Sequence, residues 1–252
     1  LWLGYFSAIS VTWIIGHLVM TRIFGREKQV GVVGGIAASF SNLLLLGIPF
    51  ITGVFGREGM ETLSLLLAVH LPVMMAASIV MIEWARRDLG QATSPLKIVR
   101  DFFTNLLSNP LIIGILGGLV WRFSGLEMPS LGTRFIDAFA NIGGTIALFA
   151  MGLSLRKFGI TGNIVPALAL SGLKLMVLPA AALVTALIFS LPPLIAQVAV
   201  VAASLPVGVN PYLIATRFGT GQNLAGNTMT ASTALAALTV TFWLYVAQSV
   251  FG

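Results

Sequence analysis

The chain has 252 residues, of which 57% are hydrophobic and only 9% are charged, and its formal net charge is +6. Soluble domains carry about 25% charged residues, so the composition excludes a soluble globular domain and a disordered chain. Cysteine is absent, which excludes a disulfide-stapled module and a thiolate site. The class that remains is a polytopic membrane protein.

Long apolar runs follow one another along the whole chain. A helix needs about 20 mostly apolar residues to cross a bilayer, and strand alternation of the barrel type is absent from the sequence. The pattern therefore predicts an all-α polytopic membrane protein with eight spans. In chain order the predicted spans 1 to 8 are residues 1–21, 29–55, 61–84, 106–123, 134–155, 164–189, 194–216 and 223–250.

The Lys and Arg residues between the spans are distributed unequally. Ten follow spans 1, 3, 5 and 7, and three lie after spans 2 and 4. The positive-inside rule places the side with ten in the cytoplasm, so a multi-pass protein of the cell inner (plasma) membrane is expected. The basic loops suit anionic lipid headgroups. Because no basic stripe carries interleaved aromatic residues, nucleic acid is not an expected partner.

The longest polar connection divides the chain in two. Residues 85–105 are interpreted as a cytoplasmic linker between an N-terminal repeat at 1–84, with three spans, and a C-terminal repeat at 106–252, with five. If the halves are repeats, the first two of ten helices precede Leu1. Repeats with an odd number of helices are inverted in the membrane.

Spans 2 and 7 contain prolines at their centres, Pro49 and Pro206. Proline inside a helix removes a hydrogen bond and costs about 3 kcal/mol, and hydrocarbon offers no water to the freed carbonyl group. Each proline suits the first position of a new half-helix. Two half-helix N-termini would then meet, each with about half a positive charge, and form a cradle for an anion. The alternative is two independent proline kinks.

Paired broken helices at matching positions of two repeats point to the binding site of a transporter. The residues around the two breaks also resemble those of the auxin efflux carrier (AEC) family, which includes the plant PIN carriers. The resemblance covers essentially the whole chain and is carried by Ala38–Asn42 with Gly47-Ile48-Pro49, Ser204–Pro211, and the runs 54–59, 141–155, 173–179 and 217–219.

The resemblance implies ten helices in two inverted five-helix repeats, with the fourth and ninth crossing at a break; here these are spans 2 and 7. It implies a scaffold part and a transport part that move relative to each other. It also implies carboxylate substrates, such as malonate and malate in bacterial members and auxin in plants. The sequence departs from the plant pattern in one respect, because spans 1, 2 and 7 contain no Asp or Glu that could serve as a proton-linked support site.

Six residues are predicted to form the substrate site: Asn42, Gly47, Pro49, Lys174, Pro206 and Asn210. An Asn amide can bind a carboxylate or a freed carbonyl group. Lys174 lies deep in span 6, where a charge costs about 2.5–3.5 kcal/mol. It is expected to balance the anion, replace a bound cation or bind the carbonyls of a broken helix, with a snorkelling lysine as the alternative. His17 and His70 are interpreted as packing residues, with a titrating role as the alternative.

Enzyme motifs such as HExxH, a phosphate-binding glycine loop or a Ser–His–Asp context are absent from the sequence, so neither an enzyme nor a metal or cofactor is expected. The prediction is a secondary transporter of small organic anions such as malate, malonate or auxin-like carboxylates. It would work by alternating access around the crossed helices, with a homodimer as a conceivable assembly. The alternatives are a sodium-coupled carrier of the bile-acid symporter type and a non-transporting membrane sensor.

Overall fold

The structure is a computed structural model that describes residues 1–87, 110–157 and 164–252, with positions 96, 99, 100, 103, 104, 107 and 162 between them. The described residues form helices and no strand, as the sequence predicts for an all-α protein. The predicted linker at 85–105 lies largely outside the described residues. The elements are α1 (Trp2–Leu18), η1 (Val19–Ile23), α2 (Lys28–Ser39), η2 (Leu43–Gly47), α3 (Ile48–Arg87), α5 (Pro110–Ser124), α6 (Ser130–Lys157), α7 (Val165–Gly172), η3 (Leu173–Val177), α8 (Leu178–Ile188), α9 (Pro193–Ser204), α10 (Asn210–Phe218) and α11 (Gln222–Phe251).

Four helical segments of the described residues are long and apolar enough to cross a membrane. They are Trp2–Ile23, Leu43–Arg87, Val165–Ile188 and Gln222–Phe251. The first, third and fourth match predicted spans 1, 6 and 8. The segment Leu43–Arg87 joins the second half of span 2 to span 3. The total of eight spans remains a prediction.

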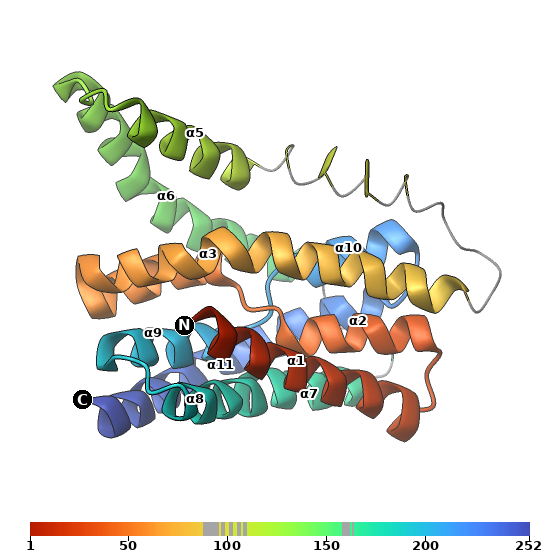
Figure 1. Ribbon diagram of the computed structural model, residues 1–252. Coiled ribbons are helices and arrows are strands. Elements are labelled where there is room, and N and C mark those ends of the chain that lie inside the picture. Colours follow the sequence, from red (N-terminus) through yellow and green to blue (C-terminus); the bar gives the residue numbers. More distant parts are fainter. Residues whose placement is uncertain are drawn as a thin grey trace.

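The helices run back and forth between two ends of the bundle (Figure 1). The turns between α1 and α2 and between α10 and α11 lie at one end, together with the end of α3. Both termini and the turn between α8 and α9 lie at the opposite end. The turn after η1, the end of α3 and the turn after α10, which the predicted spans assign to the cytoplasmic side, therefore lie at the same end of the bundle.

Glycines allow α1 and α2 to pack closely. A Cβ atom added at Gly16 would lie 2.8 Å from the Cβ atom of Ala38, and one at Gly35 would collide with the side chain of Trp13 and lie 2.8 Å from its carbonyl oxygen. Small residues bring helix backbones together in membranes, where van der Waals packing and not water exclusion drives association. The Gly34-Gly35 pair thus allows α2 to pack closely against α1.

Two wide helical turns accompany two of the prolines. The π-helices η2 and η3 end two residues before Pro49 and Pro179, respectively. Proline cannot donate a hydrogen bond to the carbonyl group four residues earlier, and its ring crowds that group. For Pro179 this group belongs to Leu175, and the indole Nε1–H of Trp243 on α11 donates to it at 2.8 Å. A carbonyl group that proline frees inside the bundle is thus satisfied by a neighbouring helix.

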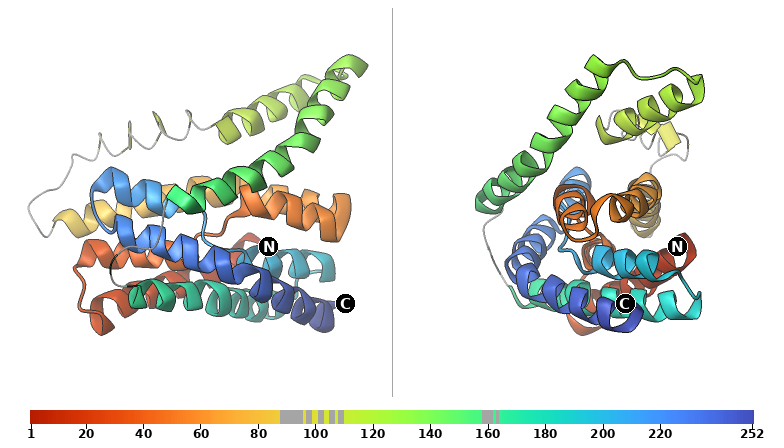
Figure 2. Two further views of the ribbon diagram at one scale, coloured as in Figure 1. Left: turned by 180° about the vertical axis from the view of Figure 1, so that it is seen from behind. Right: turned by 90° about the vertical axis from the view of Figure 1, so that its left-hand side faces the viewer.

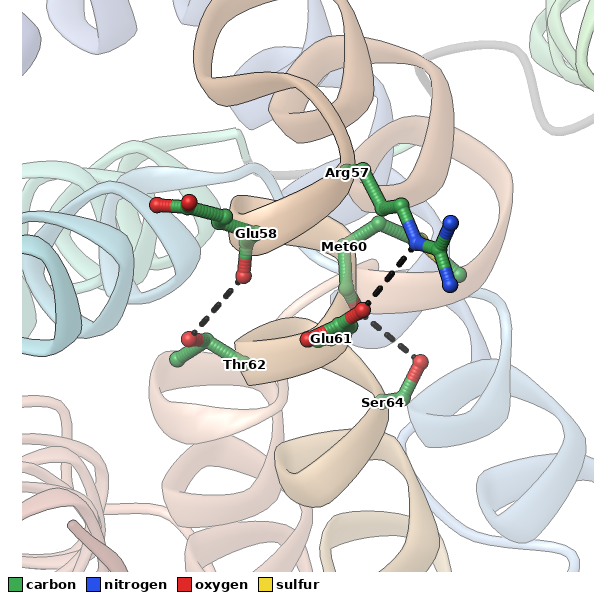
Figure 3. Close-up of polar contacts among 6 residues, drawn as sticks. All are labelled: Arg57, Glu58, Met60, Glu61, Thr62 and Ser64. Atoms are coloured by element: carbon green, nitrogen blue, oxygen red, sulfur yellow. Dashed lines mark hydrogen bonds and ion pairs between the residues drawn. The ribbon is translucent and has the colours of Figure 1, made fainter.

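The long helix α3 contains a kink at Gly56, where φ is 61° and ψ is −150°. The backbone there lies outside the helical region, which glycine tolerates because it has no Cβ atom. Figure 3 shows how the second part of α3 begins, with side chains that bind groups one turn away. Arg57 pairs with Glu61 at 3.2 Å, but both side chains are mostly exposed, so the pair contributes little to stability.

The helices α5 and α6 form a hairpin that projects from the other helices (Figure 2). Their described side chains are mostly exposed and apolar, as at Phe135, Phe139 and Phe149. The hairpin returns to the bundle through α6, which contacts η2 and α3. It therefore meets the bundle beside the first of the two broken spans.

We expect Gly35→Ala to destabilise the protein and Gly53→Ala to have no such effect. Alanine normally stabilises a helix interior by about 1 kcal/mol relative to glycine, and the Cβ atom at residue 53 would meet open space. At residue 35 it would collide with Trp13. Thermal unfolding in detergent should show a lower midpoint only for Gly35→Ala. Equal midpoints for the two variants would contradict the close packing of α1 and α2.

Candidate functional site

The two broken helices cross where their helical hydrogen bonding stops. The helices α2 and α9 have 12 residues each, which corresponds to about 18 Å, roughly half of the ~30 Å hydrocarbon core. Beyond them the chain is extended, and the two extended segments pair antiparallel at Ser41 and Val207. The N–H of Asn42 donates to the oxygen of Pro206 at 2.9 Å, and that of Gly208 donates to the oxygen of Phe40 at 3.2 Å. We call this pair of segments, residues 40–42 and 205–209, the crossing.

The break in each span lies elsewhere than predicted. Pro49 and Pro206 were expected to start the new half-helices, and the structure shows that this register is wrong. In span 2 the helix resumes directly after Asn42, so Pro49 lies more than a turn inside it. In span 7 Pro206 belongs to the extended segment and Pro211 occupies the first turn of α10. The reason is that Pro206 forces its predecessor Leu205 into an extended conformation (φ −58°, ψ 149°), which ends α9 instead of starting α10.

Lys174 binds the end of α9. The residue is completely buried, and its Nζ donates to the carbonyl oxygens of Ala203 at 2.7 Å and Leu205 at 2.5 Å. The last carbonyl groups of a helix have no partner within the helix and carry a partial negative charge. The ammonium group of Lys174 donates hydrogen bonds to these carbonyl groups and balances their partial negative charge. Of the three expected roles of Lys174, the structure shows contact with the carbonyls of the broken helix.

Side chains satisfy other backbone groups around the crossing. The N–H of Val207 donates to the hydroxyl of Ser232 on α11 at 3.1 Å, and Asn42 Oδ1 accepts from the N–H of Leu45 at 3.2 Å. The hydroxyl of Tyr5 lies 3.4 Å from that of Ser41. These bonds replace water at a point where the backbone is not helical. Asn42 therefore acts as the N-cap of the second half-helix of span 2.

A cavity of about 270 Å³ lies beside the crossing, with a wall that is mostly apolar but includes the polar side chains of Asn42, His70 and Asn210. We call it the polar crossover cavity; it is lined by residues 40–45, Leu67, His70, Leu71, residues 208–210 and Leu213. Both half-helix N-termini, at Asn42 and Asn210, border it. Its volume lies just below the range of about 300–1,000 Å³ for pockets of drug-sized ligands. With two N-termini and polar side chains in its wall, the cavity suits a small anion.

A second cavity, of about 460 Å³, has an almost entirely apolar lining. We call it the apolar crossover cavity; it is lined by Leu46, Pro49, Phe50, Leu205, Pro206, Thr233, Ala236, Ala237 and Val240. It adjoins α11 and the start of α3, whereas the polar crossover cavity adjoins α10 and the second part of α3. The polar side chain in this lining is Thr233, whose hydroxyl already donates to the carbonyl oxygen of Met229 at 2.7 Å.

The six predicted site residues thus fall into three groups. Asn42 and Asn210 line the polar crossover cavity, and Pro49 and Pro206 line the apolar one. Gly47 lines neither, but a Cβ atom there would lie 3.1 Å from the side chain of Leu205 across the crossing. Lys174 also lines neither cavity.

Sequence reasoning missed two residues of this region. His70 was interpreted as packing, yet it lines the polar crossover cavity. The sequence feature that could have indicated a role of His70 in the site is the presence of an ionisable side chain within a predicted span. Ser232 lies among several small polar residues of span 8, and nothing in the local sequence distinguishes it from these neighbours.

The comparisons with known proteins agree with a membrane transporter. The model of the family described as "Membrane transport protein" matches residues 1–244. The chain is similar to a protein of Rhizobium meliloti (strain 1021) named "Putative malonate transporter", with 27% identity over 96% of this chain and 76% of the relative.

Two plant proteins are similar over a smaller part. They are the "Probable auxin efflux carrier component 1b" and "1d" of Oryza sativa subsp. japonica. Each is 26% identical over 148 residues, which are 56% of this chain but only 26% of the rice protein. The similarity thus spans about a quarter of each plant protein.

We expect Lys174→Met to destabilise the protein more than Lys174→Gln. Methionine leaves the carbonyl groups at the end of α9 unsatisfied, which costs about 1–3 kcal/mol per group, whereas glutamine retains an amide donor. Thermal unfolding in detergent should show a midpoint lower by several degrees for Lys174→Met, with Lys174→Gln between it and the wild type. Lys28→Met, at an exposed position, serves as the control. A midpoint unchanged in Lys174→Met would contradict the capping role.

Proposed function

The chain belongs to the membrane transport protein family, that of the auxin efflux carriers, and from this premise we propose that it is a secondary carrier of small organic anions. The observation that carries the proposal is the polar crossover cavity, which is bordered by two half-helix N-termini. The cavity size favours a small carboxylate such as malonate or malate. The name of the Rhizobium relative points to the same substrate class.

In this proposal the anion binds between the two N-termini. Asn42 and Asn210 contribute amide groups, and the N-terminal ends of the two half-helices contribute positive partial charge. None of the described residues that line the cavity carries a carboxylate group, so an entering anion meets no repulsion from its wall. The crossing bonds the two broken spans to each other, so the bound anion and the crossing move as one unit. This movement opens the anion site first to one side of a plasma membrane and then to the other.

The sodium-coupled alternative is less consistent with the crossing. Half-helix C-terminal ends and unwound carbonyl groups are the usual ligands of a coupling Na⁺ in such folds. At the end of α9 the ammonium group of Lys174 already occupies two carbonyls. The described residues also contain no cluster of three or more acidic, His or Cys side chains. A non-transporting sensor would bind the anion without moving it.

Uptake of labelled malonate and malate into proteoliposomes tests the proposal. We expect saturable uptake of at least one of them that does not depend on Na⁺ and is absent from protein-free liposomes. Uptake that requires Na⁺ would favour the sodium-coupled alternative. Binding without flux would favour the sensor, and neither binding nor flux would overturn the proposal.

A new negative charge in the polar crossover cavity should block the anion without unfolding the protein. Asn210 is the first residue of α10 and is half-buried. Asn210→Asp places a carboxylate group where a helix N-terminus tolerates it, but in the proposed anion site. We expect unchanged thermal stability and uptake reduced by at least about tenfold, or about 1.4 kcal/mol of lost binding.

Asn223→Asp is the matched control for this variant. Asn223 lies in the first turn of α11, is exposed and does not line the polar crossover cavity. Its uptake should equal that of the wild type. Undiminished uptake in Asn210→Asp would place the anion elsewhere.

A further inference from the structure

His70 is buried in the wall of the polar crossover cavity. It lies on the second part of α3, is only 2% exposed and contributes to the lining of the cavity. Neither Nδ1 nor Nε2 of its ring has a hydrogen-bond partner within the described residues. His70 thus lines the cavity at which the half-helices begin, and both of its ring nitrogens are buried and unsatisfied.

Aromatic rings enclose His70 and hold its ring. The centroid of Phe6 lies at 6.3 Å in a stacked arrangement, that of Phe40 lies at 4.9 Å edge-on, and that of Tyr5 lies at 5.8 Å edge-on. These contacts account for the packing of the ring but give its nitrogens no partner. A buried donor or acceptor without a partner costs about 1–3 kcal/mol, whereas a polar ligand in the cavity can recover this energy.

The charges around His70 leave a place for an anion. Tyr5 on α1 is the titratable side chain in contact with the ring, and the charge of Lys174 on η3 repels a positive charge on the ring. No Asp or Glu is present among the described lining residues. An imidazolium ion at this position would therefore be a buried positive charge without a counter-ion from the cavity wall, and such a charge is costly unless it is paired. A bound carboxylate supplies the missing partner.

We propose that His70 binds a proton together with the carboxylate anion, so that one proton accompanies each anion; this rests on the proposed carrier function. The proton comes from the aqueous side to which the cavity is open and forms an N–H bond on the ring nitrogen that lacks hydrogen. No other covalent bond forms or breaks. Imidazolium and carboxylate attract each other strongly in a site of low dielectric constant, and each favours the binding of the other to the same extent. On the other side both leave, and the ring is neutral again.

The number of protons taken up per anion tests the inference on the unaltered protein. The heat of malonate or malate binding is measured in nanodiscs by calorimetry, in buffers with different ionisation enthalpies. The dependence of this heat on the ionisation enthalpy of the buffer gives the number of protons taken up per anion. We expect about one proton per anion near pH 7.5, because binding of proton and anion is reciprocally linked. Binding without proton uptake would overturn the inference and leave the proposed function intact.

The variant His70→Gln then assigns the proton to this residue. Glutamine can still donate a hydrogen bond to the anion but cannot take up a proton in this pH range. We expect anion binding to persist and the proton count to fall to zero. His17→Gln is the matched control, because His17 is the other histidine of the chain and does not line the cavity; its proton count should equal that of the wild type. His70→Asn provides a second variant, and gel filtration verifies that each is folded.

Flux gives a second measurement. With the membrane potential held at zero, an inward proton gradient of one pH unit should raise accumulation of the anion about tenfold in the wild type and in His17→Gln. In His70→Gln the gradient should have no effect. A gradient effect retained in a folded His70→Gln would overturn the inference. If neither malonate nor malate binds or moves in the wild type, the proposed function fails and the inference with it.

Discussion

Two backbone hydrogen bonds across the crossing, from Asn42 to Pro206 and from Gly208 to Phe40, are the interaction on which the rest of the structure depends. An interrupted helix inside a bilayer exposes N–H and C=O groups that have no water to bind. Here each broken span supplies the missing partners of the other. Neither break can therefore exist alone in this form, and the two spans are bound into one unit.

The crossing also separates charge. The C-terminal end of α9, with its partial negative charge, faces the buried ammonium group of Lys174. The N-terminal ends of η2 and α10, with partial positive charge, face the polar crossover cavity. A lysine thus stabilises the negative pole from within the chain, while the positive poles remain directed at a cavity. This asymmetry is why the proposed cargo is an anion and not a cation.

The two cavities beside the crossing differ in the polar side chains of their walls. The wall contributed by α11 is almost entirely apolar, whereas α3 brings His70 and the crossing brings Asn42 and Asn210. An anion needs donors in its wall, since a desolvated charge without partners is costly. The polar crossover cavity provides them, and the aromatic rings around His70 keep that side chain in place without satisfying its nitrogens.

The sequence by itself determined the class of the protein, the positions of the long helices and the fact that two spans are broken. These features are local: the length of an apolar run, the backbone restriction imposed by Pro206, the small residues of α2. Only the tertiary structure decided where the breaks begin, because the end of α2 at Ser39 and the start of the new helix at Asn42 follow from pairing with a segment more than 160 residues away. In the same way, packing of distant helices placed Pro49 beside an apolar cavity, joined Lys174 to Ala203, and brought His70 into the wall of the cavity that the half-helix N-termini border. No local pattern contains these contacts, since each depends on which residues of other helices come to lie nearby.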